Sequence, residues 1–133
     1  MLVLIVIAAA AGVAVALQGH VMGAADRAAG TATSVFVTYG VGGALATLYW
    51  LARGASLDAL RRVPWLSWTA GAMGLIIVAG IGYTAPRLGL AKTLIITVAA
   101  QLFAATLIEQ AIDLRRAAGL ALTIAGVWLT VKA

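Results

Sequence analysis

The chain has 133 residues, of which 64% are hydrophobic and 10% charged, and its mean hydropathy is +1.09. Average soluble domains are about half apolar and about a quarter charged, so this chain has too few polar side chains to cover a water-facing surface. The composition excludes a disordered tail, a nucleic-acid-binding module and an ordinary soluble enzyme. It indicates an all-α membrane protein.

Five apolar runs are long enough to cross a bilayer, which takes about 20 residues of helix. We expect a single transmembrane domain over residues 1–133, with helices at about 2–25, 31–51, 65–84, 89–112 and 117–131. Pro86 then falls in the connection between the third and fourth helices, where its missing N–H does no harm. A cleaved signal peptide is the alternative for the first run, but that run has no Lys or Arg in an n-region.

The connection between the second and third helices contains a capping signal and is flanked by aromatic residues. Ser56 is placed to cap a short amphipathic turn that lies on the membrane surface. Trp50, Trp65 and Trp68 fit the aromatic belt at a membrane interface. Glycines fall inside the helices, among them Gly42 and Gly43, and we expect them to form packing seams rather than ligand contacts.

The basic residues at the helix ends divide almost evenly between the two membrane faces. Five spans put the N-terminus and the 2–3 and 4–5 loops on one face, side A, and the C-terminus on the other, side B. Side A carries Arg53, Arg61, Arg62, Arg115 and Arg116, whereas side B carries Arg27, Arg87, Lys92 and Lys132. This balance nearly cancels the positive-inside signal and favours insertion in both orientations. The alternative is that a weak bias still fixes one orientation.

Polar side chains inside a membrane are costly and therefore indicate function. With a rise of about 1.5 Å per residue, four such side chains lie roughly 10 to 18 Å from side B. They are Gln18, Tyr39, Thr97 and Gln101, and we expect them to converge on one cavity. Amide, phenol and hydroxyl groups both donate and accept hydrogen bonds, so the set fits a neutral or zwitterionic solute. The alternatives are that the glutamines only join helices and that Thr97 bonds its own backbone.

Two titratable residues, Glu109 and His20, are candidates for coupling transport to protons. The alternatives are that Glu109 pairs with Arg115 or Arg116 near side A and that His20 is simply wetted at the interface. One histidine and no cysteine cannot build a usual zinc centre, and no catalytic triad is available. We therefore expect no metal, no cofactor and no enzymatic activity.

Three stretches resemble the YdcZ-type family of the drug/metabolite transporter superfamily, which is related to small multidrug resistance and EamA-type transporters. The stretch from Gly12 to Gly30, with Ala16-Leu17-Gln18-Gly19, is similar to the family's opening helix. Ala85-Pro86-Arg87-Leu88-Gly89, followed by Ala100-Gln101-Leu102 and Glu109, is similar to its fourth helix. The ending from Gly119 to Val127 is similar to the superfamily's last helix. Unlike small multidrug resistance proteins, the chain has no carboxylate in its predicted first helix.

The resemblance implies a secondary active transporter that exports small metabolites or drug-like compounds by alternating access. Two five-helix chains would form a ten-helix antiparallel dimer with inverted-repeat symmetry, in the plasma (inner) membrane of a bacterium or archaeon. The expected partners are the lipid bilayer, a small-molecule solute, and a second copy or a paired homologous subunit, but no nucleic acid. The alternative is a structural or accessory subunit of a larger transporter that does not itself transport. A channel is disfavoured by the apolar gaps between polar positions.

Overall fold

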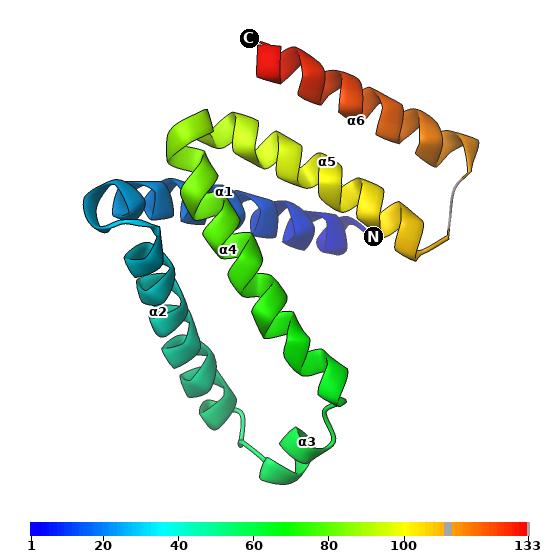
Figure 1. The fold of residues 1–133 in the computed structure, drawn as a ribbon. Coiled ribbons are helices and arrows are strands. Elements are labelled where there is room, and N and C mark those ends of the chain that lie inside the picture. The colour runs from blue at the N-terminus through cyan, green and yellow to red at the C-terminus, as the bar shows by residue number, and fades with distance from the viewer. Residues whose placement is uncertain (111–112, 133) are drawn as a thin grey trace.

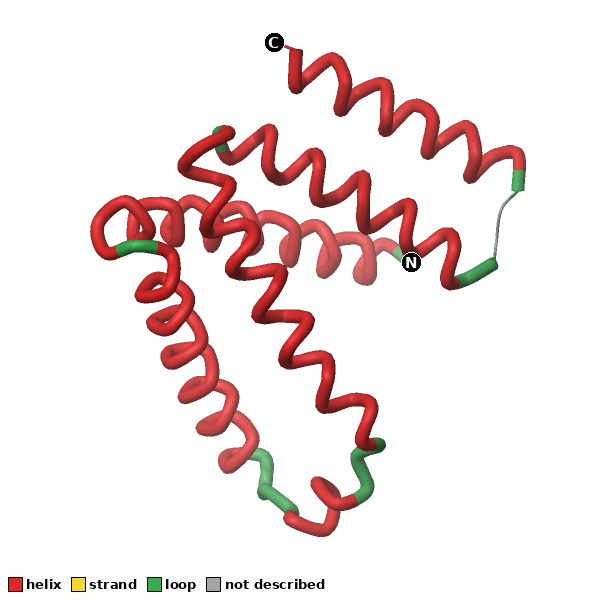
Figure 2. The backbone as a smooth tube through the Cα atoms, in the orientation of Figure 1, coloured by secondary structure: helices red, strands yellow, loops and turns green. Residues whose placement is uncertain are grey.

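The computed structural model describes residues 1–110 and 113–132, and within these ranges the regular structure is entirely helical (Figures 1 and 2). The long helices are α1 (Leu2–Ala29), α2 (Thr31–Ala52), α4 (Thr69–Leu88), α5 (Leu90–Ile108) and α6 (Leu114–Lys132). Between α2 and α4 lie the short helix α3 (Leu57–Arg61) and a 3-10 turn, Trp65–Trp68. Among the described residues, five helical segments are long and apolar enough to cross a membrane. The chain is thus an all-α, multi-pass membrane protein, as its composition predicts.

The first helix is longer than predicted, because it continues past residue 25 to Ala29 and so includes Asp26. The expectation of a first helix without a carboxylate was therefore wrong. The helix accommodates this charge because Thr31 donates a hydrogen bond to the Asp26 carboxylate and Arg87 forms an ion pair with it. A buried charge is tolerated in a protein when it is paired in this way.

Pro86 lies inside the last turn of α4, not in the connection that follows the helix. A proline near a helix end removes one backbone hydrogen bond, so the helix continues to Leu88 at a modest cost. The chain turns at Gly89, whose φ of 89° suits a residue without a Cβ, and the Gly89 N–H donates to the carbonyl of Ala85 at 3.0 Å. The 3–4 connection is therefore a single glycine.

The last two predicted spans also have different ends in the structure. The predicted fourth helix, 89–112, ends as α5 at Ile108, because Glu109 and Gln110 form a turn in which Gln110 has a φ of 49°. Residues 111–112 lie outside the described residues. Helix α6 begins at Leu114 and not at 117, because the Asp113 carboxylate accepts the N–H of Arg116 at 2.7 Å and caps the first turn.

The ends of the helices that the sequence assigns to side B lie together. The end of α1 meets the start of α2, and the end of α4 meets the start of α5 (Figure 1). Lys92 at the start of α5 donates to the carbonyl of Val131 at the end of α6, at 3.4 Å. These contacts agree with helices that alternate in direction along the chain.

Within the described ranges, the buried residues gather where the second half of α1 crosses α2, α4 and α5. The residues of α1 buried at this crossing are Gly19, Met22, Gly23 and Asp26. Away from it α2 and α4 diverge from α1, and α6 lies along the outer side of α5 (Figure 1). The first half of α1 is exposed throughout. One chain therefore has only a small core of its own.

The exposed area confirms that the single chain is open. Its accessible surface is 9950 Å², whereas a compact monomer of this mass exposes about 6,500 Å². Large apolar side chains such as Leu4, Phe36, Leu45 and Ile76 account for much of the exposed surface. A surface of this kind requires lipid, a second protein chain, or both to cover it.

Candidate functional site

A hollow of about 410 Å³ lies between α1, α2 and α4, and two predicted solute contacts line it. Its walls are formed by Gln18 of α1, by Thr38, Tyr39, Gly42, Gly43 and Ala46 of α2, and by Val78 of α4. The volume falls within the range of about 300 to 1,000 Å³ that is common for small-molecule sites. The structure thus brings Gln18 and Tyr39 together from different helices.

The hydroxyl of Tyr39 lies close to a glycine on the facing helix. A Cβ added at Gly74 of α4 would lie 2.6 Å from the Tyr39 hydroxyl oxygen, which is closer than van der Waals contact allows. Only glycine at position 74 leaves room for the phenol where it now lies. Gly74 therefore provides the space that the Tyr39 hydroxyl occupies.

The glycines of α2, which are predicted to form packing seams, make no close helix contact within one chain. A Cβ added at Gly40, Gly42 or Gly43 would meet no atom within 4 Å. Within one chain they therefore do not support a close helix contact, and Gly42 and Gly43 line the hollow instead. Their small size widens the space beside Tyr39.

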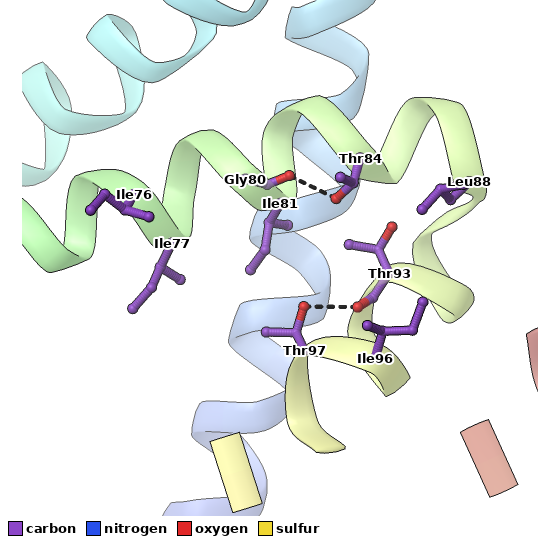
Figure 3. A pocket seen from close by; sticks show the side chains of 9 residues that line it. All are labelled: Ile76, Ile77, Gly80, Ile81, Thr84, Leu88, Thr93, Ile96 and Thr97. Carbon is purple, nitrogen blue, oxygen red and sulfur yellow. Dashed lines mark hydrogen bonds between the residues drawn. The ribbon is translucent and has the colours of Figure 1, made fainter. Parts of the chain in front are cut away.

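A second hollow, of about 260 Å³, lies between α4 and α5 and contains Thr97 (Figure 3). The Thr97 hydroxyl donates to the carbonyl of Thr93 at 2.8 Å, so the alternative in which Thr97 bonds its own backbone is confirmed. Thr84 on the opposite wall does the same with the carbonyl of Gly80, at 2.7 Å. Thr93 lies between them and is buried.

The four predicted solute contacts do not meet in one hollow of a single chain. Gln18 and Tyr39 share the first hollow, Thr97 lines the second, and Gln101 is exposed further along α5. Within the described residues, α5 does not pack against α2. The solute-binding role of this set stays a prediction, and a shared site would need residues from more than one chain.

The two candidates for proton coupling lie in separate places. Glu109 forms an exposed ion pair with Arg116 at 3.0 Å, the pairing offered as its alternative, and both residues line a hollow of about 380 Å³ between α5 and α6. His20 lines a smaller hollow, of about 150 Å³, together with Arg27 and Leu90. His20 is not among the residues that line the hollow of Gln18 and Tyr39.

An ion pair joins α1 and α4 where the helices cross, and the sequence did not indicate it. Arg87 lies 3.0 Å from the Asp26 carboxylate, whose side chain is 4% exposed. The Arg87 guanidinium also stacks on the Tyr83 ring at 3.8 Å and donates to the Tyr83 carbonyl at 2.6 Å. The sequence places Arg87 among the basic residues of side B, but no local pattern links it to Asp26, 61 positions earlier.

The comparison with known families agrees with this architecture. A family model described as "Putative inner membrane exporter, YdcZ" matches residues 3–129. No curated protein and no solved structure matches the chain. The match begins in α1 and ends in α6, so it covers the residues that line every hollow described above. The chain therefore belongs to the YdcZ inner membrane exporter family.

Proposed function

We propose that this chain is one half of a secondary transporter that exports small neutral or zwitterionic metabolites or drug-like compounds. Family membership supports export, and five apolar helices support a location in the plasma (inner) membrane of a bacterium or archaeon. The observation that carries the proposal is the hollow of about 410 Å³ that joins the Gln18 amide and the Tyr39 phenol. Transport, and not catalysis, is the activity that such a site in such a membrane protein supports.

The proposed working unit is an antiparallel dimer. Gln18 and most residues around it are exposed in the single chain, so the hollow needs another surface to close it. A second copy in the opposite orientation would cover part of the large apolar surface and would relate the two halves by inverted symmetry. The near balance of basic residues on the two faces supports insertion in both orientations.

This arrangement suggests how the predicted site could be assembled. Because α5 does not reach α2 within one chain, we assign Thr97 and Gln101 to the site through the α5 helix of the second copy. Gln18 and Tyr39 of the first copy would supply the facing wall. Amides and hydroxyls from both copies would then surround the solute without any net charge.

A flux measurement tests this proposal. Proteoliposomes containing the purified chain are loaded with a mixture of neutral amino acids and nucleosides, and the released compounds are quantified by mass spectrometry. We expect saturable release of at least one compound and a loss of release in Gln18→Leu. The control is Thr47→Val, since the Thr47 hydroxyl already donates to the Gly43 carbonyl at 2.8 Å and does not line the hollow.

The same measurement distinguishes a transporter from an accessory subunit that does not itself transport. If Gln18→Leu and the parent protein release the same compounds at the same rate, Gln18 is only a packing contact. If neither releases any compound above empty liposomes, the chain does not transport these solutes by itself. Flux that then appears only with an added homologous subunit would identify this chain as one member of a pair.

A further inference from the structure

Thr93 in α5 is buried but does not make the side-chain hydrogen bond that most helical threonines make. Seven of them donate to the carbonyl oxygen four residues earlier: Thr38, Thr47, Thr84, Thr97, Thr106, Thr123 and Thr130. In the part of the chain that the structure describes, Thr93 Oγ1 is the one buried side-chain polar atom without a hydrogen-bond partner. Thr93 is 4% exposed. A ready acceptor exists, because the carbonyl of Gly89 already accepts the Thr93 N–H at 3.1 Å.

The unpaired hydroxyl needs a partner that the chain itself does not provide. Buried polar groups in native proteins nearly always have a hydrogen-bond partner, because leaving water without replacing its hydrogen bonds is costly. The Thr93 hydroxyl does not make the backbone hydrogen bond that seven other threonines make. The side chain faces the end of α4 that carries Thr84 and Leu88 (Figure 3). Thr93 lines the hollow between α4 and α5, and its hydroxyl has a donor and acceptor positions that no described residue uses.

The rest of this hollow indicates what kind of molecule would fit. Its walls include the aliphatic side chains of Ile77, Ile81 and Ile96, and none of the residues that line it is charged. An ionised group placed there would be buried without a counter-charge, which is strongly unfavourable. The volume of about 260 Å³ lies below the range of about 300 to 1,000 Å³ that is usual for drug-sized ligands.

We propose that the groove between α4 and α5 is a second solute site, specific for a small, uncharged, mainly apolar molecule with one hydrogen-bonding oxygen, which Thr93 Oγ1 binds. This inference rests on the proposed function in one respect: the bound molecule is taken to be an exported solute. Within one chain the groove and the hollow of Gln18 and Tyr39 share no lining residue. Thr97 lines the groove, and its assignment to the Gln18 site in the proposed dimer would place it beside both sites. A lipid acyl tail would fill the apolar part of the groove but would leave the Thr93 hydroxyl unpaired.

Photolabelling tests the site without requiring transport. The probes are a diazirine-bearing hexanol and a diazirine-bearing hexane that lacks only the hydroxyl, each added to the full chain in lipid nanodiscs. After illumination, labelled peptides are mapped by mass spectrometry. We expect the alcohol to label α4 and α5 around Ile81 and Ile96 more strongly than the alkane does.

Variants at Thr93 distinguish the effect of the hydroxyl on labelling from the effect of the shape of the groove. Thr93→Val keeps the volume and should reduce labelling by the alcohol roughly 3- to 10-fold, the value of one hydrogen bond, without changing labelling by the alkane. Thr93→Ser restores the hydroxyl and should restore labelling. The matched control is Thr106→Val on the same helix, whose hydroxyl is already bonded to the Leu102 carbonyl at 2.8 Å. Thermal melting of each variant verifies that it is folded.

Three results would overturn the proposal. Equal labelling by both probes would mean that the groove binds any apolar chain, including a lipid acyl tail, without using the Thr93 hydroxyl. Unchanged labelling by the alcohol in Thr93→Val, with a smaller cross-linked dimer fraction, would mean that a second copy binds the hydroxyl. If the folded parent protein is not labelled by either probe, the proposed second site does not exist. The proposed function would still stand if flux is saturable. Labelling by the alcohol without any flux would instead contradict the proposed function and keep the site.

Discussion

Arg87 at the end of α4 lies 3.0 Å from the carboxylate of Asp26 near the end of α1, although 61 positions separate the two residues in the chain. Thr31, the first residue of α2, donates to the other oxygen of the same carboxylate. One acidic side chain therefore fastens three helices at a single corner. These are the three helices that form the hollow around Gln18 and Tyr39.

Breaking this ion pair should destabilise the protein. Arg87→Gln leaves the Asp26 carboxylate buried without its counter-charge, so we expect a clear fall in the melting temperature of the purified protein in detergent. Adding Asp26→Asn to Arg87→Gln removes the unpaired charge and should recover part of the loss. The control is Arg61→Gln, whose exposed pair with Asp58 spans 3.7 Å and should change stability by less than about 1 kcal/mol. Equal melting temperatures for Arg87→Gln and Arg61→Gln would show that the corner is not held by the ion pair.

Gly74→Ala should displace the Tyr39 hydroxyl from its present position. The new Cβ would lie 2.6 Å from that oxygen, and the end of the tyrosine side chain is the part that can move. We therefore expect solute flux to fall at least several-fold while the melting temperature changes little. Gly71→Ala on the same helix is the control, because a Cβ at Gly71 would meet no atom within 4 Å. Identical flux in the two variants would argue against a role for Tyr39 in solute binding.

Part of this structure follows from local patterns in the sequence. Apolar runs between charged residues predicted five spans, and Ser56 was expected to cap the turn in which it accepts the N–H of Ala59 at 3.2 Å. The preference of membrane threonines for their own backbone predicted the bond made by Thr97. Each of these features depends on residues within one helix or one turn.

Other features depend on how helices rotate and tilt against one another, which apolar composition does not determine. Gln18 and Tyr39 meet in one hollow, whereas Gln101 at a similar predicted depth does not join them. The ion pair between Asp26 and Arg87 and the free hydroxyl of Thr93 likewise arise from contacts between helices. Sequence alone could identify the polar candidates but not which of them share a cavity.

The coupling role can be assigned by comparing Glu109 with His20. A coupling role for Glu109 requires that protonation release its ion pair with Arg116. It predicts that a proton gradient accelerates flux in the parent protein and in His20→Gln but not in Glu109→Gln. The Glu109 ion pair is exposed, so its loss should change stability by no more than about 1 kcal/mol. Flux in proteoliposomes with and without an imposed pH difference measures the effect. Stimulation that persists in Glu109→Gln and disappears in His20→Gln would reverse the assignment.

The central claim, that one chain supplies both halves of an antiparallel transporter, is tested most directly by the location of its C-terminus. Paired fusions in bacteria place there one reporter that is active only in the cytoplasm and one that is active only outside it. Because side A and side B carry nearly equal numbers of basic residues, we expect both reporters to be active at comparable levels. Activity of only one reporter would contradict the antiparallel homodimer and would require an oppositely oriented partner subunit.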